Sequence, residues 1–314
     1  MPSKTIPLAL PLSTAPGRDG FVGGNRLVNC YAQKRIVNGK AGTLISPVAG
    51  LKSFVTLAGA TSIRGMIEVD GVGYVVADAL LYSVTSSGVA TLLGAIPGAG
   101  PVSMARNRRT PSPDIIIVSD GLVYLTNGST VSRLSDEDLP PPNGVVVING
   151  YAVYTIADGR ILASAIDNAG NIDPLSLARE DTNPDQNVGI AKRGQDVVVF
   201  GTKSVGFWHD VGGDPFPLEP ISSIDSVGCL SRSSIVEADQ TLFWVASDGT
   251  VRRLAGYAAQ VVSSDDIAEA IASTTDKANI QALAWVDRGN TMIEFSCADW
   301  TYVLNLATGF WHEQ

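Results

Sequence analysis

A pattern of four short apolar runs joined by tight turns recurs along the chain. At spacings of 40 to 47 residues, it restarts near residues 61, 101, 143, 186, 232 and 279. One blade of a β-propeller occupies ~40 to 50 residues, which matches these spacings. A propeller also leaves few strand edges exposed, because its sheets follow one another around a ring. The repeat therefore predicts an all-β chain, a β-propeller of about six four-stranded blades.

The turns within the first unit support this interpretation. Residues 61–96 read TSIRGMIEVDGVGYVVADALLYSVTSSGVATLLGAI, where Asp70-Gly71, Asp78 and Ser87-Gly88 separate four β-rich runs. Aspartate and glycine are favoured where a tight turn needs a positive φ. The fifth unit repeats the pattern with SSIVEAD, QTLFWVAS and TVRRLAGYAAQVVS, and the sixth with IQALAWVD, TMIEFSC, WTYVLNL and FWHE.

Composition agrees with many short strands. The chain is 45% apolar and 17% charged, with 32 glycines and 17 prolines scattered along its 314 residues. No run approaches the ~18 apolar residues of a membrane span, so we expect none. The N-terminus imitates a signal peptide only weakly, because Pro7 and Pro11 interrupt its apolar stretch and its basic region is a single lysine.

The expected organisation has two parts. Residues 1–59 form an extended N-terminal segment with a strand that joins or closes the propeller, and residues 60–314 form the propeller itself. One short helix is predicted over 263–273, between the fifth and sixth blades. Ser263 or Ser264 can cap it, and Asp265 and Asp266 complement the helix dipole rather than bind a metal.

Both histidines of the chain lie between a tryptophan and a carboxylate. His209 stands in FWHD and His312 in FWHE. A carboxylate can orient an imidazole for acid–base catalysis, so these pairs raise the possibility of an active site. However, neighbours along a strand point to opposite faces. We therefore interpret both motifs as aromatic strands with polar tips, His209 on the third strand of unit four and His312 on the last strand of unit six.

Other chemistry finds little support in the sequence. Cys30, Cys229 and Cys297 are odd in number and widely spaced, which predicts neither disulfides nor a zinc site. No nucleophile elbow, zinc-protease, phosphate-loop or dinucleotide motif is present. Glu68, Asp114 and Asp196 could supply carboxylates for sugar cleavage, but each lies beside a turn. We expect no enzyme, no catalytic residues, and no cofactor or metal site.

The charge of the chain argues against tight binding of nucleic acid. The formal net charge is −9, with a pI near 4.7. One basic cluster, Arg106, Arg108 and Arg109, lies in the Pro- and Asn-rich stretch MARNRRTPSPD. We interpret it as a solvated turn, because tracking of phosphates usually needs a longer basic stripe.

An ordered series of stretches resembles a known family. The series is GNRLVNCYAQ, PVAGLKSFVTL, IRGMIEVDGVGYVV, GPVSMARN, SVGFWHDVGGDPFPLEPISSIDSVGCLSRSSI, LFWVASDGTVRRLAGYAAQVVSSDDIAEAI and TYVLNLATGFWHEQ. From about residue 20 onward, the chain resembles the packaged-DNA stabilisation, tail hub or nozzle proteins of short-tailed bacteriophages. Members of this family usually continue beyond the position of FWHEQ, so a shortened chain is expected. They tend to have other polar residues where His209 and Asp210 stand.

The resemblance implies a non-enzymatic component of the phage tail, made and assembled in the bacterial cytoplasm. Such proteins form a homo-hexameric ring below the portal and its adaptor ring. They continue the channel for double-stranded DNA, help retain the packaged genome, and meet a tail needle, fibre or spike. The isolated chain could be monomeric. The alternative is a carbohydrate-binding or carbohydrate-active β-propeller, which requires an aromatic platform or a carboxylate cluster in one funnel.

Overall fold

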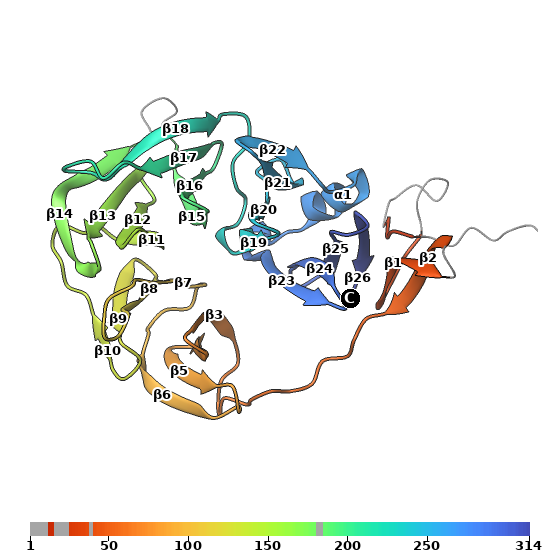
Figure 1. Cartoon of the computed structure of the whole chain (residues 1–314), viewed down its shortest axis with the longest axis horizontal. Helices are drawn as coiled ribbons and strands as arrows, with labels where there is room; N and C mark the ends of the chain where they lie inside the picture. Colours follow the sequence, from red (N-terminus) through yellow and green to blue (C-terminus); the bar gives the residue numbers. More distant parts are fainter. Residues whose placement is uncertain (1–11, 16–24, 38–39, 180–184) are drawn as a thin grey trace, which may run out of the picture. The chain divides into compact units, whose positions relative to one another are not determined.

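The computed structural model describes residues 12–15, 25–37, 40–179 and 185–314. In this part of the chain, six four-stranded antiparallel sheets follow one another, each with its strands in simple meander order (Figure 1). The all-β prediction of a propeller with six four-stranded blades is confirmed. Each blade begins within a few residues of a predicted restart.

The described residues form two compact units. The first contains the described residues of Met1–Gly50 together with Ser233–Arg253 and Gln260–Gln314. The second contains those of Leu51–Arg232 together with Leu254–Ala259. The division of the chain between residues 59 and 60 stays a prediction.

The first four blades lie in the second unit. The first consists of β3 (Ile63–Val69), β4 (Val72–Ala77), β5 (Leu80–Thr85) and β6 (Ala90–Ala95). The second consists of β7 (Ser103–Arg106), β8 (Ile115–Ser119), β9 (Leu122–Thr126) and β10 (Val131–Arg133). The third consists of β11 (Pro142–Ile148), β12 (Tyr151–Ile156), β13 (Arg160–Ala165) and β14 (Asn168–Arg179). The fourth consists of β15 (Asn187–Arg193), β16 (Asp196–Gly201), β17 (Val205–Asp210) and β18 (Leu218–Ile224).

The remaining elements complete the fold. The fifth blade consists of β19 (Val236–Ala238), β20 (Thr241–Val245), β21 (Val251–Ala255) and β22 (Ala258–Val261). The sixth consists of β23 (Gln281–Asp287), β24 (Asn290–Ser296), β25 (Thr301–Asn305) and β26 (Phe310–Glu313). Outside the blades lie β1 (Cys30–Val37), β2 (Lys40–Pro47), the helix α1 (Asp265–Ser273) and the 3-10 turns η1 (Arg232–Ser234) and η2 (Lys277–Asn279).

Local sequence explains the hairpins and the helix. Asp70 and Gly71 both have a positive φ, at 52° and 82°, as a two-residue hairpin turn with the twist of its strands requires. The side chain of Ser264 caps α1 by accepting from the backbone N–H of Ile267, so the second of the two predicted serines is the cap. The fifth blade starts later than SSIVEAD suggests. Ser234 belongs to η1, and its buried hydroxyl accepts from the backbone N–H of Val245.

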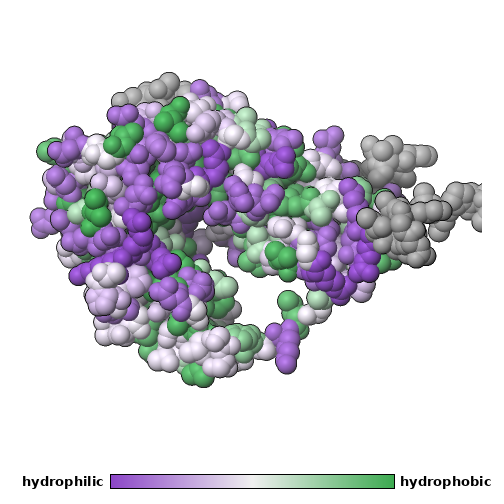
Figure 2. All heavy atoms as spheres, viewed as in Figure 1, coloured by the Kyte–Doolittle hydropathy of each residue, from purple (hydrophilic) through white to green (hydrophobic). Residues whose placement is uncertain are grey.

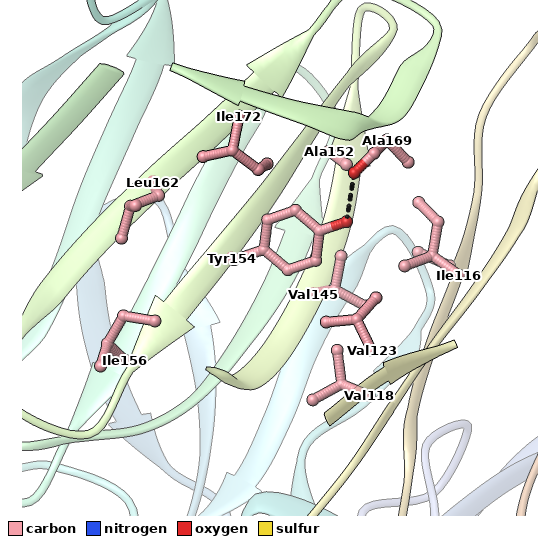
Figure 3. Packing of buried hydrophobic residues seen from close by; sticks show 11 residues of the cluster. Ile116, Val118, Val123, Val145, Ala152, Tyr154, Ile156, Leu162, Ala169 and Ile172 are labelled. Carbon is pink, nitrogen blue, oxygen red and sulfur yellow. Dashed lines mark hydrogen bonds between the residues drawn. The ribbon is translucent and has the colours of Figure 1, made fainter. Parts of the chain in front are cut away.

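Alternate residues of one strand face two different cores. In β8, Ile115 and Ile117 pack in the core shared with the first blade, whereas Ile116 and Val118 pack in the core shared with the third. All four side chains are buried. Figure 3 shows the core between the second and third blades, centred on Tyr154. A third core joins the third and fourth blades. The four blades of this unit are therefore held together face to face.

The N-terminal strands pack on the sixth blade. Residue Val28 makes an isolated parallel bridge with Glu313 in β26. The backbone N–H of Asn29 donates to the carbonyl oxygen of Glu313 at 2.8 Å, and the backbone N–H of Glu313 donates to the carbonyl oxygen of Leu27 at 2.8 Å. Tyr31 of β1 packs in a small core with Met292 and Val303 of the sixth blade. The backbone beside β26 thus adds one further edge contact to this sheet.

Tyr154 allows a test of the core between the second and third blades. Its hydroxyl donates to the backbone carbonyl of Ala169 at 2.9 Å, inside the cluster (Figure 3). Burial raises the pKa of this phenol well above its usual value, so it stays protonated. We expect Tyr154→Phe to cost ~1 kcal/mol, because one buried carbonyl loses its donor, and Tyr154→Ala to cost ~3 to 5 kcal/mol. Urea denaturation measures both; equal costs would contradict this packing.

Candidate functional site

The structure pairs His209 with a carboxylate other than the one beside it in sequence. His209 and Asp196 are cross-strand partners on β17 and β16. The His209 Nδ1 lies 2.9 Å from Asp196 Oδ1. Asp210 instead accepts from the side-chain amide of Asn149 at 2.6 Å. The prediction that neighbouring histidine and aspartate do not act together is consistent with this geometry.

Two further side chains complete the cluster around Asp196. The hydroxyl of Tyr257 lies 3.3 Å from Asp196 Oδ2, and a terminal nitrogen of Arg193 lies 3.2 Å from the same oxygen. The Arg193 guanidinium stacks over the rings of Phe207 and Tyr257, at 5.4 and 5.0 Å from their centroids. It also donates to the backbone carbonyl of Gly256. Arg193 therefore holds the turn between β21 and β22 against the fourth blade.

This arrangement is better suited to holding chain segments together than to catalysis. A carboxylate oxygen can only accept, so the Nδ1 of His209 donates to Asp196. The side chain of His209 is 45% exposed. No serine, threonine or cysteine is hydrogen-bonded to this imidazole in the described residues. A base without a nucleophile and an oxyanion site lacks the groups that acyl transfer requires.

His312 lies in a different environment. It is buried in β26, with its ring centroid 5.7 Å from that of Tyr31. Among the described residues, its Nδ1 has no hydrogen-bond partner. Burial lowers the pKa of this imidazole from 6.5 to about 4, because the charged form loses its hydration. His312 is thus a neutral ring of the core at physiological pH.

Glu313, next to His312, anchors the N-terminal segment. Its carboxylate accepts from the Thr14 hydroxyl and the Arg26 guanidinium. Burial alone would raise the pKa of this carboxyl, but the hydrogen bonds from Arg26 and Thr14 hold it below its usual range. The two His-acid motifs of the sequence therefore have different structural roles.

The three candidate carboxylates lie in three different blades, and each has its own partner. Glu68 lies on β3 and accepts from the backbone N–H of Gly71 in the adjacent turn. Asp114 accepts from the side-chain amide of Asn107 at 2.8 Å, within one loop of the second blade. Asp196 pairs with His209 in the fourth blade. Each carboxylate has a local partner, and in the described residues no hydrogen bond joins one of the three to another.

The described part of the chain contains neither a cluster of metal ligands nor a helix that could span a membrane. Its histidine, cysteine, aspartate and glutamate side chains form no group of three or more that could hold a metal ion. The thiols of Cys30, Cys229 and Cys297 form no disulfide. Asp265 and Asp266 occupy the first turn of α1. No helix in these residues is long and apolar enough to cross a membrane.

The tryptophans pack within the blades. Trp208, Trp244 and Trp311 are buried, and Trp285 and Trp300 are half-buried. Trp300 donates to the Thr274 hydroxyl at 2.8 Å, and Trp311 donates to the Val262 carbonyl at 3.1 Å. A sugar platform needs an exposed aromatic face, which the buried rings do not offer.

Trp208 and His209 make a matched pair for mutagenesis. Trp208 is 3% exposed and belongs to the core between the third and fourth blades. We expect Trp208→Ala to cost ~3 to 5 kcal/mol of unfolding free energy through cavity formation. His209→Gln keeps a polar group beside Asp196 and should change the unfolding free energy by less than ~1 kcal/mol. A cost for His209→Gln as large as that for Trp208→Ala in urea denaturation would contradict this assignment.

Because His312 is buried as a neutral ring, we expect the free energy of unfolding to fall in mild acid. Because its folded pKa is lowered to about 4, its contribution is complete above the unfolded pKa of 6.5 and is lost as the pH falls toward 4. Between pH 7 and pH 5, this linkage amounts to ~2 kcal/mol. Urea unfolding at both pH values should show that loss in the wild type and a smaller loss in His312→Leu. An equal loss in both proteins would show that another group carries the acid sensitivity.

Comparisons with known proteins give a family and a fold. A family model for phage stabilisation proteins, described as bacteriophage P22 Gp10, beta-propeller, matches residues 24–308. No curated protein sequence matches the chain. Among solved structures, a catalytically inactive virginiamycin B lyase from Staphylococcus aureus with quinupristin is similar, with 11% identity and a TM-score of 0.58. The similarity covers 90% of this chain and 88% of the lyase.

A second similar structure is a streptogramin B lyase, with 14% identity and a TM-score of 0.53. Here 91% of this chain and 87% of the lyase are covered. At these identities, the likeness concerns the propeller fold and carries no information about chemistry, because one fold supports many unrelated functions.

Proposed function

The chain belongs to the phage stabilisation family of bacteriophage P22 Gp10, and from that premise we propose that it is a structural component of a phage tail. In this proposal it forms a hub or nozzle ring that continues the DNA channel below the portal and its adaptor. The ring helps retain the packaged genome. The observation that carries the proposal is the family match over residues 24–308.

The described chemistry supports a role without catalysis. Glu68, Asp114 and Asp196 lie in three different blades, and each forms a hydrogen bond with a residue of its own blade. The exposed imidazole of His209 lacks a hydrogen-bonded nucleophile in the described residues. The carbohydrate alternative is less well supported, because Trp208, Trp244 and Trp311 are buried and cannot form a platform for a sugar.

An acidic protein suits a conduit for DNA. Proteins bind DNA without sequence preference mainly because their basic side chains neutralise phosphates. A net charge of −9 disfavours such neutralisation. Weak adhesion lets a duplex slide during packaging and ejection. Retention then depends on a small number of contacts and on the fit of the ring.

A ring of several copies is needed for conduction. The duplex is about 20 Å wide, judged from its groove dimensions, and the channel along the axis of a single propeller is narrow and largely filled. Heterologous contacts that close by rotation generate such a ring, for which the family resemblance implies six copies. We propose the portal adaptor above and a tail needle, fibre or spike below as its partners. The isolated chain can remain monomeric and gain neighbours through local concentration on the adaptor.

Electron microscopy of labelled virions tests this proposal. A tag on the protein should appear around the tail axis, below the portal, with the symmetry of a ring. The purified chain should behave as a monomer or small oligomer in sedimentation. Label on the capsid shell or on peripheral fibres would contradict the proposed function.

A further inference from the structure

The loop between β7 and β8 presents three arginines on an acidic protein. Arg106 ends β7, and Arg108 and Arg109 follow in the loop that leads to β8. All three residues are exposed. The chain as a whole has 31 acidic residues against 22 basic ones, so this concentration of positive charge is a local exception.

A buried asparagine fixes the backbone of this loop. Asn107 is 1% exposed. Its side-chain oxygen accepts from the backbone N–H groups of Asp114 at 2.7 Å and Arg109 at 3.2 Å. Its amide donates to the Asp114 carboxylate at 2.8 Å. The backbone N–H of Arg108 donates to the Asp167 carboxylate at 3.2 Å, which ties the loop to the third blade. The loop therefore presents its arginines from a defined backbone.

The guanidinium groups themselves are weakly engaged. Arg106 lies 3.4 Å from Asp70, and Arg109 lies 3.5 Å from Asp114. The side chains of Arg106 and Arg109 are 47% and 57% exposed, and ion pairs of this kind stabilise little. In the described residues, the Arg108 side chain has no hydrogen bond or ion pair. An incoming anion can therefore compete for all three groups.

Charge is polarised along the second blade. In a four-stranded meander, the hairpin between the first two strands lies at one end of the sheet, and the connection after the fourth lies at the other. The connection after β10 carries Asp136, Glu137 and Asp138. At the loop end the three arginines offset the carboxylates of Asp70, Asp114 and Asp167, so a polyanion is repelled there less than at the end with Asp136, Glu137 and Asp138. Figure 2 shows a strongly hydrophilic band on the visible face where the second and third blades meet.

In place of the solvated turn that the sequence alone suggested, we propose that the loop of Arg106, Arg108 and Arg109 binds phosphate groups of the DNA backbone. The proposal rests on the function proposed above and names the residues that touch the genome. Guanidinium groups fit phosphate oxygens through paired N–H donors, and such contacts carry no sequence information. A docked protein would require an apolar centre. The loop exposes no large apolar side chain, although Ile166 beside Asp167 is exposed.

A small number of contacts per copy suits retention without adhesion. Three phosphate contacts give a slope of about −2.7 for log K against log salt, or ~40-fold in affinity between 50 and 200 mM salt. One copy therefore binds weakly at physiological salt. Several loops on one ring contact the same duplex together, so their effects multiply through effective concentration.

Fluorescence anisotropy with a labelled 25-base-pair duplex tests the loop on the full chain. We expect the wild type to bind at 25 mM salt with a slope near −2.7 and no preference between unrelated sequences. The triple variant Arg106→Gln, Arg108→Gln, Arg109→Gln should lose at least tenfold in affinity. The matched control Lys34→Gln, Arg35→Gln, Lys52→Gln removes the same charge from other exposed positions and should lose little. Equal losses in both, or no binding by the wild type, would overturn the proposal.

Two further variants separate charge from folding. Replacing the three arginines by lysine should keep most of the salt-dependent binding. Arg108→Gln removes the side chain that has no partner in the described residues, so it should leave the melting temperature unchanged and reduce the slope by about 1. An unchanged slope for Arg108→Gln would contradict its role in phosphate binding.

Phage particles distinguish this inference from the function on which it rests. Virions that carry the triple glutamine variant should contain the protein at the tail axis and lose DNA faster on heating than the wild type. Normal placement with normal DNA retention would overturn the role of the loop alone. Misplacement of the wild-type protein would overturn the tail function.

Discussion

The inner strands of the second and third blades are buried on both faces, and the packing of the second unit depends on this condition. Ile115 and Ile117 of β8 enter one core while Ile116 and Val118 enter another. In β12, Val153 faces the fourth blade whereas Ala152 and Tyr154 face the second. Burying each large apolar side chain stabilises the folded state by ~1.5 to 3 kcal/mol. An isolated blade would lose this stabilisation on at least one face. A blade of this composition is therefore stable only between neighbours.

Burial of both faces also determines where chemistry can occur. Strand interiors are occupied by apolar side chains, so charged groups gather where strands end. The Asp196 cluster lies at such a place, at the start of β16 and near the end of β17. The arginine loop lies beyond the end of β7. His312 also lies near a strand end, in β26, but it is buried, and its lowered pKa reflects the desolvation that a charged imidazole would suffer there.

Much of the fold could be predicted from the sequence because turns punctuate it. The pair Asp70-Gly71 marks a hairpin, and the serine and aspartates before Ile267 mark the start of α1. Side-chain partners across strands could not be predicted in this way. Asp196 and His209 are 13 residues apart, and only the register of β16 against β17 brings them together. Tyr257 joins them from another blade, and no local signal identifies it.

Native-state hydrogen exchange measures the dependence of one blade on the next most directly. If no blade of the second unit is stable alone, the amides of β8, β12 and β16 must exchange through a common opening. Their free energies and their dependence on urea should then equal those of the unfolding of the unit as a whole. Exchange of β12 at a much lower free energy than β8 and β16, without dependence on urea, would show that the blades open separately and would contradict this view of the fold.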